Sequence, residues 1–219
     1  MLSGRKLDRK LLGLEQKFWA EGFSFIGGVD EVGRGPLAGP VVAACVVLPR
    51  GVELPAVNDS KQLTEKRREE LENELKSLPG LQWGVGVVDV EEIDRLNILR
   101  ATHLAMRKAV LELGKVDFLL VDGNPVPGLP YPSHSVVKGD AKSASIAAAS
   151  IIAKVTRDRM MVELDAEYPG YGFAEHKGYG TKAHLENLRR LGPSPVHRRS
   201  FGPVKALLGG GAEQLELWN

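Results

Sequence analysis

Short apolar runs alternate with stretches of helical periodicity along the first two-thirds of the chain. β-Branched and aliphatic residues concentrate in five short runs, each bounded by glycine, proline or polar residues, which is typical of strands. Strands interleaved with helices indicate the α/β class. The five predicted strands cover residues 25–31, 41–48, 81–88, 117–122 and 133–138.

Between and after these strands, apolar residues recur at the three- and four-residue spacing of helices. An Asp-x-x-Glu cap formed by Asp89 and Glu92 opens one of these helices, and we expect a break in it near Asn97. Gly139 and Asp140 are expected to start a long helix rich in alanine and isoleucine. The predicted helices cover residues 7–21, 64–78, 89–113, 139–167, 182–191 and 203–208.

The 219 residues are enough for one sizeable domain with a small appendage. After the Tyr-Pro-Gly turn at residues 168–170 the chain becomes rich in loops and basic residues. We therefore predict a core over residues 1–168, including the N-terminal helix at 7–21. A small basic helical part over residues 169–208 and a flexible tail over residues 209–219 complete the predicted organisation.

Composition narrows the class of protein. The apolar fraction of 43% and the charged fraction of 26% are ordinary for a soluble globular protein. The apolar run at residues 41–48 is too short to cross a bilayer, and the N-terminus lacks the apolar segment of a signal peptide. The single cysteine, Cys45, lies within that run and fits core packing. We expect a cytoplasmic monomer with no membrane association.

The net charge of +1 conceals an uneven distribution. Residues 171–205 contain seven Lys or Arg and only two acids, so the rest of the chain carries a net negative charge. Charge of this kind is also found on ordinary solvated helix faces. A basic region beside an acidic site would suit a polyanion that is held while a metal acts on it. The seven basic residues are Lys177, Lys182, Arg189, Arg190, Arg198, Arg199 and Lys205.

Four acidic residues stand at the ends of predicted core elements. Asp30 and Glu31 end one apolar strand, Asp122 ends another, and Asp140 opens the long helix. Buried carboxylates are costly without a partner, and a cluster of four would repel itself without cations. Oxygen ligands are those that Mg²⁺ and Mn²⁺ prefer, so the pattern predicts a metal site.

Each acid also has a simpler interpretation. Asp122 could start the turn that follows it, and Asp140 could be an ordinary helix N-cap. Asp30 and Glu31 are neighbours, and neighbours on a regular strand point to opposite faces. A bend at Gly33, a bulge, or a contribution of Glu31 from the other side of the strand would each reconcile them with one site. The sequence leaves these possibilities open.

The glycines after these acids have two interpretations. Gly33, Gly35 and Ala38 match the G-x-G-x-x-A fingerprint of dinucleotide-binding proteins. That function requires a helix directly after the glycines, but residues 39–48 are strand-like. The two acids upstream would also repel a diphosphate. The pattern favours a backbone that another molecule can approach closely.

Five segments of the chain, which include the four acids and the glycines, closely resemble ribonuclease HII in its bacterial form. The resemblance spans about residues 25 to 201 and keeps the order of the family's motifs. The segments that carry it are GVDEVGRGPLAGP at 28–40, DSKQL at 59–63, VDGN at 121–124, KGDAKSASIAAASIIAK at 138–154 and HKGYGT at 176–181.

The resemblance implies an RNase H-like α/β core, with a mixed central sheet flanked by helices and a small helical C-terminal part. It implies that catalysis uses Mg²⁺ or Mn²⁺, and that the acidic ligands correspond to Asp30, Glu31, Asp122 and Asp140. It also implies three groups of substrate-binding residues. Gly33, Arg34 and Gly35 correspond to the segment that senses the ribose 2′-hydroxyl, and Tyr179 to the tyrosine that stacks on the neighbouring deoxyribose. Lys61, Lys142 and Ser143 are weaker candidates for holding phosphates.

The activity implied by the resemblance is endonucleolytic hydrolysis of the RNA strand of RNA–DNA hybrids. It includes cutting 5′ of a single ribonucleotide embedded in duplex DNA, which leaves 3′-hydroxyl and 5′-phosphate ends and serves ribonucleotide removal. Two alternatives are a non-catalytic nucleic-acid binding module and a metal-dependent phosphatase of small molecules. The first leaves the four acids unexplained, and the second leaves the basic region unexplained.

The C-terminus carries a further motif. Three glycines at 209–211 form a flexible linker. The segment from Gln214 to Trp218 looks like the short Gln-Leu-x-Leu-aromatic peptide by which bacterial replication and repair proteins hold the sliding clamp. Leu215 and Leu217 would face one way in an extended peptide, although these residues could instead pack back on the domain.

Overall fold

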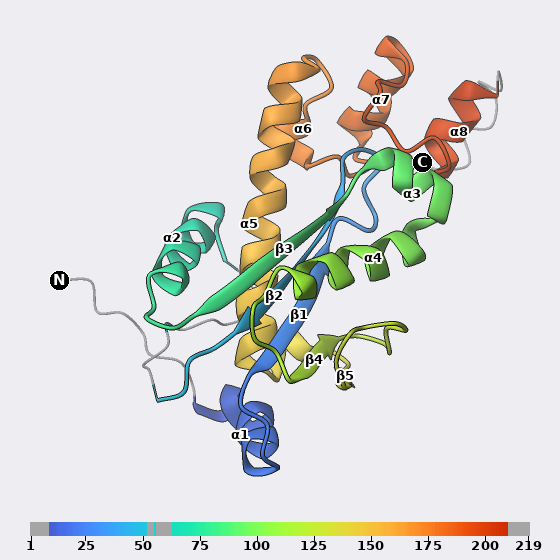
Figure 1. The fold of residues 1–219 in the computed structure, drawn as a ribbon. Coiled ribbons are helices and arrows are strands. Elements are labelled where there is room, and N and C mark those ends of the chain that lie inside the picture. Colours follow the sequence, from blue (N-terminus) through green and yellow to red (C-terminus); the bar gives the residue numbers. More distant parts are fainter. Residues whose placement is uncertain (1–8, 52–54, 56–62, 210–219) are drawn as a thin grey trace. The chain divides into compact units, whose positions relative to one another are not determined.

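The computed structural model describes residues 9–51, 55 and 63–209 (Figure 1). The described residues form two compact units. The first unit contains those up to Val32, those from 42 to 87 and those from His103 to Val155, and the second contains residues 33–41, 88–102 and 156–209. These units are discontinuous in sequence, and the division into residues 1–168, 169–208 and 209–219 stays a prediction.

A five-stranded mixed sheet forms the centre of the first unit, as predicted. β1 pairs antiparallel with β2 and parallel with β4, which itself pairs parallel with β5. β1 is therefore an inner strand, with neighbours on both sides. The strands in spatial order are β3 (Gln82–Val88), β2 (Val41–Val47), β1 (Ile26–Val32), β4 (Phe118–Asp122) and β5 (Ser133–Val136).

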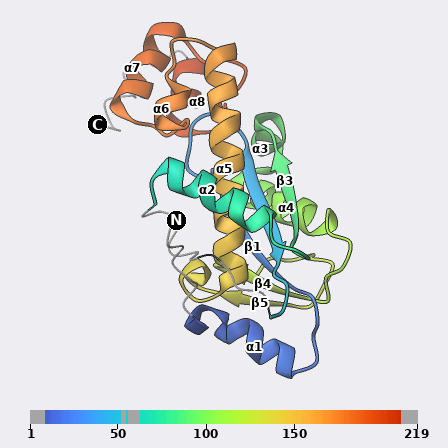
Figure 2. The same cartoon turned by 90° about the vertical axis from the view of Figure 1, so that its left-hand side faces the viewer.

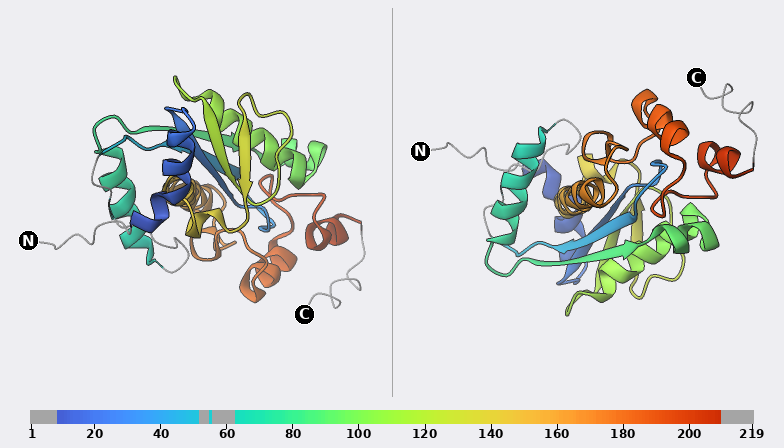
Figure 3. Two further views of the ribbon diagram at one scale, coloured as in Figure 1. Left: turned by 90° about the horizontal axis from the view of Figure 1, so that it is seen from below. Right: turned by 90° about the horizontal axis from the view of Figure 1, so that it is seen from above.

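Helices α4 (Ile98–Leu111) and α5 (Ala144–Glu167) lie on opposite sides of this sheet (Figure 3). Glycines in the strands allow both helices to approach closely. A Cβ at Gly28 would overlap the backbone of Ser145 in α5, and one at Gly86 would overlap the carbonyl of Ala105 in α4. β2 is buried along its whole length, which explains its unbroken apolar sequence.

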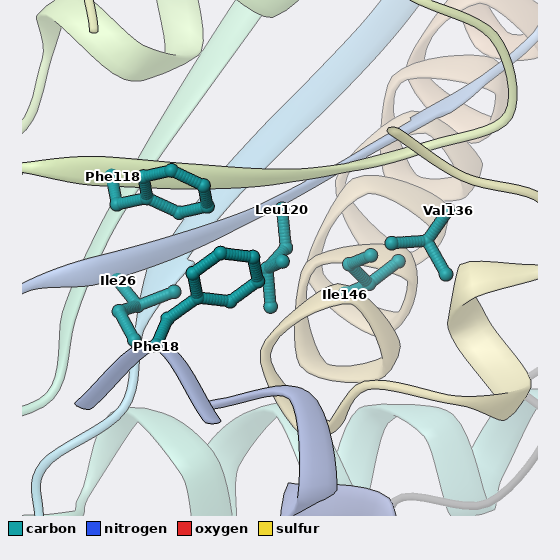
Figure 4. Close-up of a cluster of buried hydrophobic side chains, with 6 residues drawn as sticks. All are labelled: Phe18, Ile26, Phe118, Leu120, Val136 and Ile146. Carbon is teal, nitrogen blue, oxygen red and sulfur yellow. The ribbon is translucent and has the colours of Figure 1, made fainter. Parts of the chain in front are cut away.

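The core beneath α1 (Gly13–Ala20) joins the N-terminal segment to the sheet and to the start of α5 (Figure 4). The rings of Phe18 and Phe118 stack with centroids 4.2 Å apart. α1 lies beside β4 and β5 at the same end of the first unit as the opening turns of α5 (Figure 2). The buried cluster comprises Phe18, Ile26, Phe118, Leu120, Val136 and Ile146.

Apart from the start of the long helix, the predicted helices form with small shifts in their bounds. A 3₁₀ turn, η1 (Arg9–Leu12), precedes α1, and Thr64 caps α2 (Glu65–Lys76). The predicted break near Asn97 is confirmed, because Asn97 has a φ of 71° and separates α3 (Val90–Leu96) from α4. None of the described helices is both long and apolar enough to span a membrane.

Besides α3, the second unit contains three short helices near the C-terminal end of the described residues. α7 (Lys182–Leu191) has the predicted bounds, and α8 (Gly202–Leu208) begins one residue early. α6 (Phe173–His176) was not predicted, since four residues are too few to show a helical period. The second unit has two apolar clusters of its own, one around Leu188 and the other around Phe173.

Candidate active site

Two of the predicted acids meet at one edge of the sheet. Val29 of β1 pairs with Val121 of β4 in parallel register, and Asp30 and Asp122 are the next residues along. Residues at matching positions of neighbouring parallel strands point to the same face. The Asp30 and Asp122 side chains therefore lie side by side. Their proximity is set by the register of two strands that are far apart in sequence.

Asp30 is the most perturbed carboxyl of this group. Its side chain is only 6% exposed, and it accepts hydrogen bonds from the hydroxyl of Ser150 in α5 and from the Glu31 backbone N–H at 2.7 Å. Burial, followed by repulsion from Glu31 and Asp122, raises the pKa of Asp30 from 3.8 to about 8. The two hydrogen bonds only partly offset these effects, so the site favours an added positive charge.

Asp140 reaches the same edge through a turn. Asp122 Oδ1 accepts a 2.6 Å hydrogen bond from the backbone N–H of Gly139, the residue before Asp140. Asp140 is buried within η3 (Gly139–Ala141), which follows Lys138 in a left-handed conformation with a φ of 56°. The long helix begins only at Ala144, so the prediction that Gly139 and Asp140 start it was wrong.

Glu31 continues the regular strand after Asp30. Asp30 pairs with Ala44 and Glu31 with Ala43 in an unbroken antiparallel ladder, so no bulge separates the two acids. Asp30 contacts α5 through Ser150, and strand alternation places Glu31 on the other face. The structure therefore has no bulge between the two acids and places Glu31 on the face opposite Asp30, and the contribution of Glu31 to one site stays a prediction.

We name Asp30, Glu31, Asp122 and Asp140 the acidic cluster and ask whether it fits a divalent cation. The donor set consists of carboxylate oxygens, which hard cations prefer, and Asp30 is destabilised by like charge. In the described part of the chain, no three Asp, Glu, His or Cys side chains are already arranged to hold a metal ion. Asp30 and Asp122 each direct an oxygen to a backbone N–H instead. The chemistry of the cluster fits the cation, and each of these two carboxylates has a second oxygen outside the backbone hydrogen bond.

The glycine loop, residues 33–40, belongs to the second unit and is held by two arginines that the sequence analysis missed. Arg157 and Arg198 are both fully buried. Arg157 donates at 2.9–3.2 Å to the carbonyls of Ala38, Pro40 and Lys177. Arg198 donates at 2.6–3.2 Å to the carbonyls of Gly33, Arg34, Gly39 and Pro40.

Burial lowers the pKa of Arg157 to about 10, and burial together with repulsion from Arg157 lowers that of Arg198 to about 9. Both remain charged at neutral pH. Arg198 was counted in the sequence among the charges available to a polyanion, but its guanidinium faces the loop carbonyls. No sequence signal distinguishes it from the exposed Arg199 beside it.

The predicted 2′-hydroxyl sensor lies at the start of this loop. Gly33 is buried with a φ of 91°, and a Cβ there would overlap the Arg157 side chain. Only glycine fits both the backbone conformation and the space. Arg34 and Gly35 are exposed, so this end of the loop combines a fixed backbone with open access.

Tyr179 lies against the same loop. The Leu37 N–H donates to the Gly178 carbonyl at 2.8 Å, and a Cβ at Gly35 would be 3.6 Å from the Tyr179 ring. The ring is 43% exposed, so much of its face is free for another molecule. The structure thus brings together two motifs that are more than a hundred residues apart in sequence.

The remaining predicted substrate contacts differ in their surroundings. Lys142 is exposed, and its ammonium donates to the Val137 carbonyl at 2.8 Å. Ser143 is fully buried and donates to the Glu15 carboxylate at 2.6 Å, so a phosphate contact would require it to leave this arrangement. Lys61 lies outside the described residues.

Comparison with known proteins gives consistent matches. The family model for ribonuclease HII matches residues 27–204. Ribonuclease HII of Caldanaerobacter subterraneus is 54% identical over 188 residues, which are 85% of this chain and 78% of the relative. The crystal structure of ribonuclease H2 from Pyrococcus horikoshii has a TM-score of 0.69 at 30% identity, covering 90% of this chain and all of the other. Ribonuclease HII in the PCNA complex from Archaeoglobus fulgidus has a TM-score of 0.68 at 26% identity, covering 82% and 96%.

Proposed function

The chain belongs to the ribonuclease HII family, and from this premise we propose that it cuts ribonucleotide-containing duplexes at the acidic cluster. Family membership makes it a metal-dependent ribonuclease H of type 2. The proposed reaction hydrolyses the RNA strand of RNA–DNA hybrids and cuts 5′ of single ribonucleotides in DNA. The products carry 3′-hydroxyl and 5′-phosphate ends, and the role is ribonucleotide removal.

The buried Asp30, destabilised by Glu31 and Asp122, is the observation that carries this proposal. We propose that Asp30 and Asp122 hold two divalent ions in common, and that Glu31 and Asp140 complete one ion each. When bound, Mg²⁺ or Mn²⁺ would supply an activated water and stabilise the charge on the leaving oxygen. The register of β1 and β4 keeps two of these carboxylates together before any ion arrives.

Selection of a ribonucleotide is proposed to depend on the glycine loop and Tyr179. The 2′-hydroxyl both donates and accepts hydrogen bonds, so backbone groups of residues 33–35 can recognise it if the sugar comes close. Arg34, which is exposed, is proposed to clamp a phosphate, and the exposed ring of Tyr179 to cover the next sugar. The ammonium of Lys142, with Lys61, is proposed to hold the phosphate backbone.

The test is incubation of the protein with a labelled DNA duplex that contains one ribonucleotide. We expect a single cut 5′ of the ribonucleotide with Mg²⁺ or Mn²⁺, no cut with EDTA, and no cut in an all-DNA duplex. Binding without cutting under every metal condition would favour the binding module, and hydrolysis of p-nitrophenyl phosphate alone would favour the phosphatase. Either outcome would contradict the proposal.

A separate proposal concerns the segment from Gln214 to Trp218, which lies outside the described residues. We propose that it binds a bacterial sliding clamp, on the strength of its sequence and of the archaeal relative solved in complex with PCNA. Deleting residues 214–219 should abolish capture of the protein by immobilised clamp while leaving hydrolysis unchanged. Capture that persists after the deletion would refute this proposal.

A further inference from the structure

Three histidine rings form a group beside the backbone of Tyr179 in the second unit. His184 and His197 are buried, and their Nε2 atoms are 3.1 Å apart. His184 Nδ1 lies 2.8 Å from the carbonyl oxygen of Tyr179. The ring of His176 stacks on that of His184 at 4.3 Å, and its Nδ1 accepts from the Gly178 N–H at 3.2 Å. Histidine nitrogens therefore bind the backbone on both sides of the Gly178–Tyr179 segment.

The partners of these rings allow one consistent placement of the protons. A carbonyl oxygen only accepts, so His184 Nδ1 must carry a proton and donate it to Tyr179. In a neutral ring His184 Nε2 is then an acceptor, and His197 Nε2 must donate to it. This leaves His197 Nδ1 to accept, and the Ser194 N–H faces it at 3.0 Å. We call this directed chain, from Ser194 through His197 and His184 to Tyr179, the histidine relay.

The surroundings keep the relay uncharged at neutral pH. The ring of Phe173 meets that of His184 edge-on at 5.5 Å and also packs against His197. Burial lowers the pKa of both His184 and His197 to about 4. A second proton on either ring would place two donors face to face, so the neutral form is the one that fits.

We propose that His184, oriented by His197, is a positioning residue that holds Tyr179 where its ring can cover the sugar next to the cut. The inference rests on the proposed role of Tyr179 in the function above. Tyr179 is 43% exposed and its side chain interacts electrostatically with Arg157 and Arg198, so its backbone is a further constraint on its place beside Gly35. The relay holds that backbone at its carbonyl, which also accepts from the Thr181 N–H at 2.8 Å, and His176 accepts from the preceding Gly178 N–H.

Asparagine and glutamine substitutions test the relay sharply, because each keeps a nitrogen near the position of only one histidine ring nitrogen. Asparagine places its amide nitrogen near the position of histidine Nδ1, and glutamine near that of Nε2. At position 184 we expect His184→Asn to keep the donor to Tyr179 and cleave within about threefold of the wild type. His184→Gln loses that donor and should lower kcat/KM for the one-ribonucleotide duplex with Mg²⁺ by about tenfold, the rate equivalent of one hydrogen bond.

The preference should be reversed at position 197. His197→Gln keeps a donor toward His184 and should be nearly unaffected, whereas His197→Asn loses it and should be impaired. A merely structural role predicts that the two variants at each position behave alike, because both remove the same ring. Circular dichroism and urea unfolding establish that the two variants at each position are folded to the same degree. If a variant at position 184 does not fold, the two variants at position 197 test the relay.

Tyr179→Ala in the same assay separates the two levels of the proposal. An impaired Tyr179→Ala, the expected amide preferences, and no additional loss in the His184→Gln, Tyr179→Ala double variant would support the inference. An impaired Tyr179→Ala with no amide preference at either position would overturn the relay and leave the role of Tyr179 intact. An unimpaired Tyr179→Ala would overturn that role itself, and the relay's function with it.

Discussion

The acidic cluster and the glycine loop both bury ionisable side chains, but at neutral pH Asp30 keeps its proton whereas Arg157 and Arg198 stay charged. In the acidic cluster, Asp30 has like-charged neighbours and a pKa raised to about 8. In the glycine loop, each buried guanidinium has backbone carbonyls as partners within hydrogen-bonding distance. The charged form of Asp30 is therefore disfavoured, whereas the charged guanidiniums donate to the carbonyls around them.

The glycine loop is held by the protein's own side chains, whereas the acidic cluster is proposed to need a bound cation. The carbonyls of the glycine loop are fixed by the protein's own side chains, so the loop can keep its shape before substrate arrives. The acidic cluster holds Asp30 and Asp122 side by side through strand register, yet their oxygens are directed at backbone N–H groups. In the proposed mechanism the glycine loop recognises the substrate without a bound ion, whereas catalysis at the acidic cluster requires the cation.

The largest expected effect comes from neutralising Asp30. Asp30→Asn should lower cleavage of the one-ribonucleotide duplex by about ten-thousandfold, since metal ligation supplies several kcal/mol to the transition state. Binding of the uncut duplex, measured by fluorescence anisotropy, should persist because the glycine loop is untouched. Glu112→Gln, which removes an exposed carboxylate from the same unit, should cleave normally. Full activity of Asp30→Asn would remove the acidic cluster from the mechanism.

Removing Arg198 should destabilise the glycine loop strongly. Arg198→Met leaves buried carbonyls without their donor, and we expect the free energy of unfolding to fall by about 4 kcal/mol. The neighbouring Arg199 is exposed, so Arg199→Met should stay within about 0.5 kcal/mol of the wild type. Urea denaturation measures both, and equal stabilities would show that the guanidinium does not hold the loop.

The buried Asp30 should make the stability of the protein depend on pH. Between pH 4 and pH 8 the folded metal-free protein keeps a proton on Asp30 that the unfolded chain has released. Its free energy of unfolding should therefore fall by several kcal/mol in total as pH rises through this window. Asp30→Asn should lose this slope, and Mg²⁺ should offset it in the wild type. Parallel pH profiles for the two proteins in EDTA would contradict the origin assigned to it.

A smaller effect is expected from adding one methyl group to the loop. A Cβ at Gly35 would meet only the Tyr179 ring, at an ordinary 3.6 Å, so Gly35→Ala should fold with little loss of stability. The added group would stand where the sugar is proposed to approach, and kcat/KM should fall by about tenfold. Gly13→Ala, at a position with open space, is the matched control. Unchanged kcat/KM for Gly35→Ala would place the sugar elsewhere.

The sequence predicted the strands and the ends of β1 and β4 because apolar runs that end in acids are a local signal. It misplaced the start of the long helix, since Gly139-Asp140 has the composition of a helix cap. The turn at η3 instead depends on the Lys138 conformation and on the hydrogen bond from Gly139 to Asp122. That contact joins residues seventeen apart and has no periodic signature.

The support of the glycine loop could not be predicted in the same way. Arg157 meets Ala38 and Pro40 across more than a hundred residues, and Arg198 meets Gly33 across 165. Buried arginines look like exposed ones in a sequence, because their burial depends on which carbonyls tertiary folding brings to them. The same holds for His184 and His197, whose basic surroundings suggested only a surface that attracts polyanions.

Diffraction from crystals of the protein soaked in Mn²⁺, recorded near the manganese absorption edge, tests the acidic cluster most directly. We predict an anomalous peak for manganese bound by oxygens of Asp30 and Asp122, with Glu31 or Asp140 as a further ligand. No such peak is expected in Asp30→Asn. Manganese that is absent from these carboxylates in a soaked, active protein would contradict the central claim that they gather the catalytic cation.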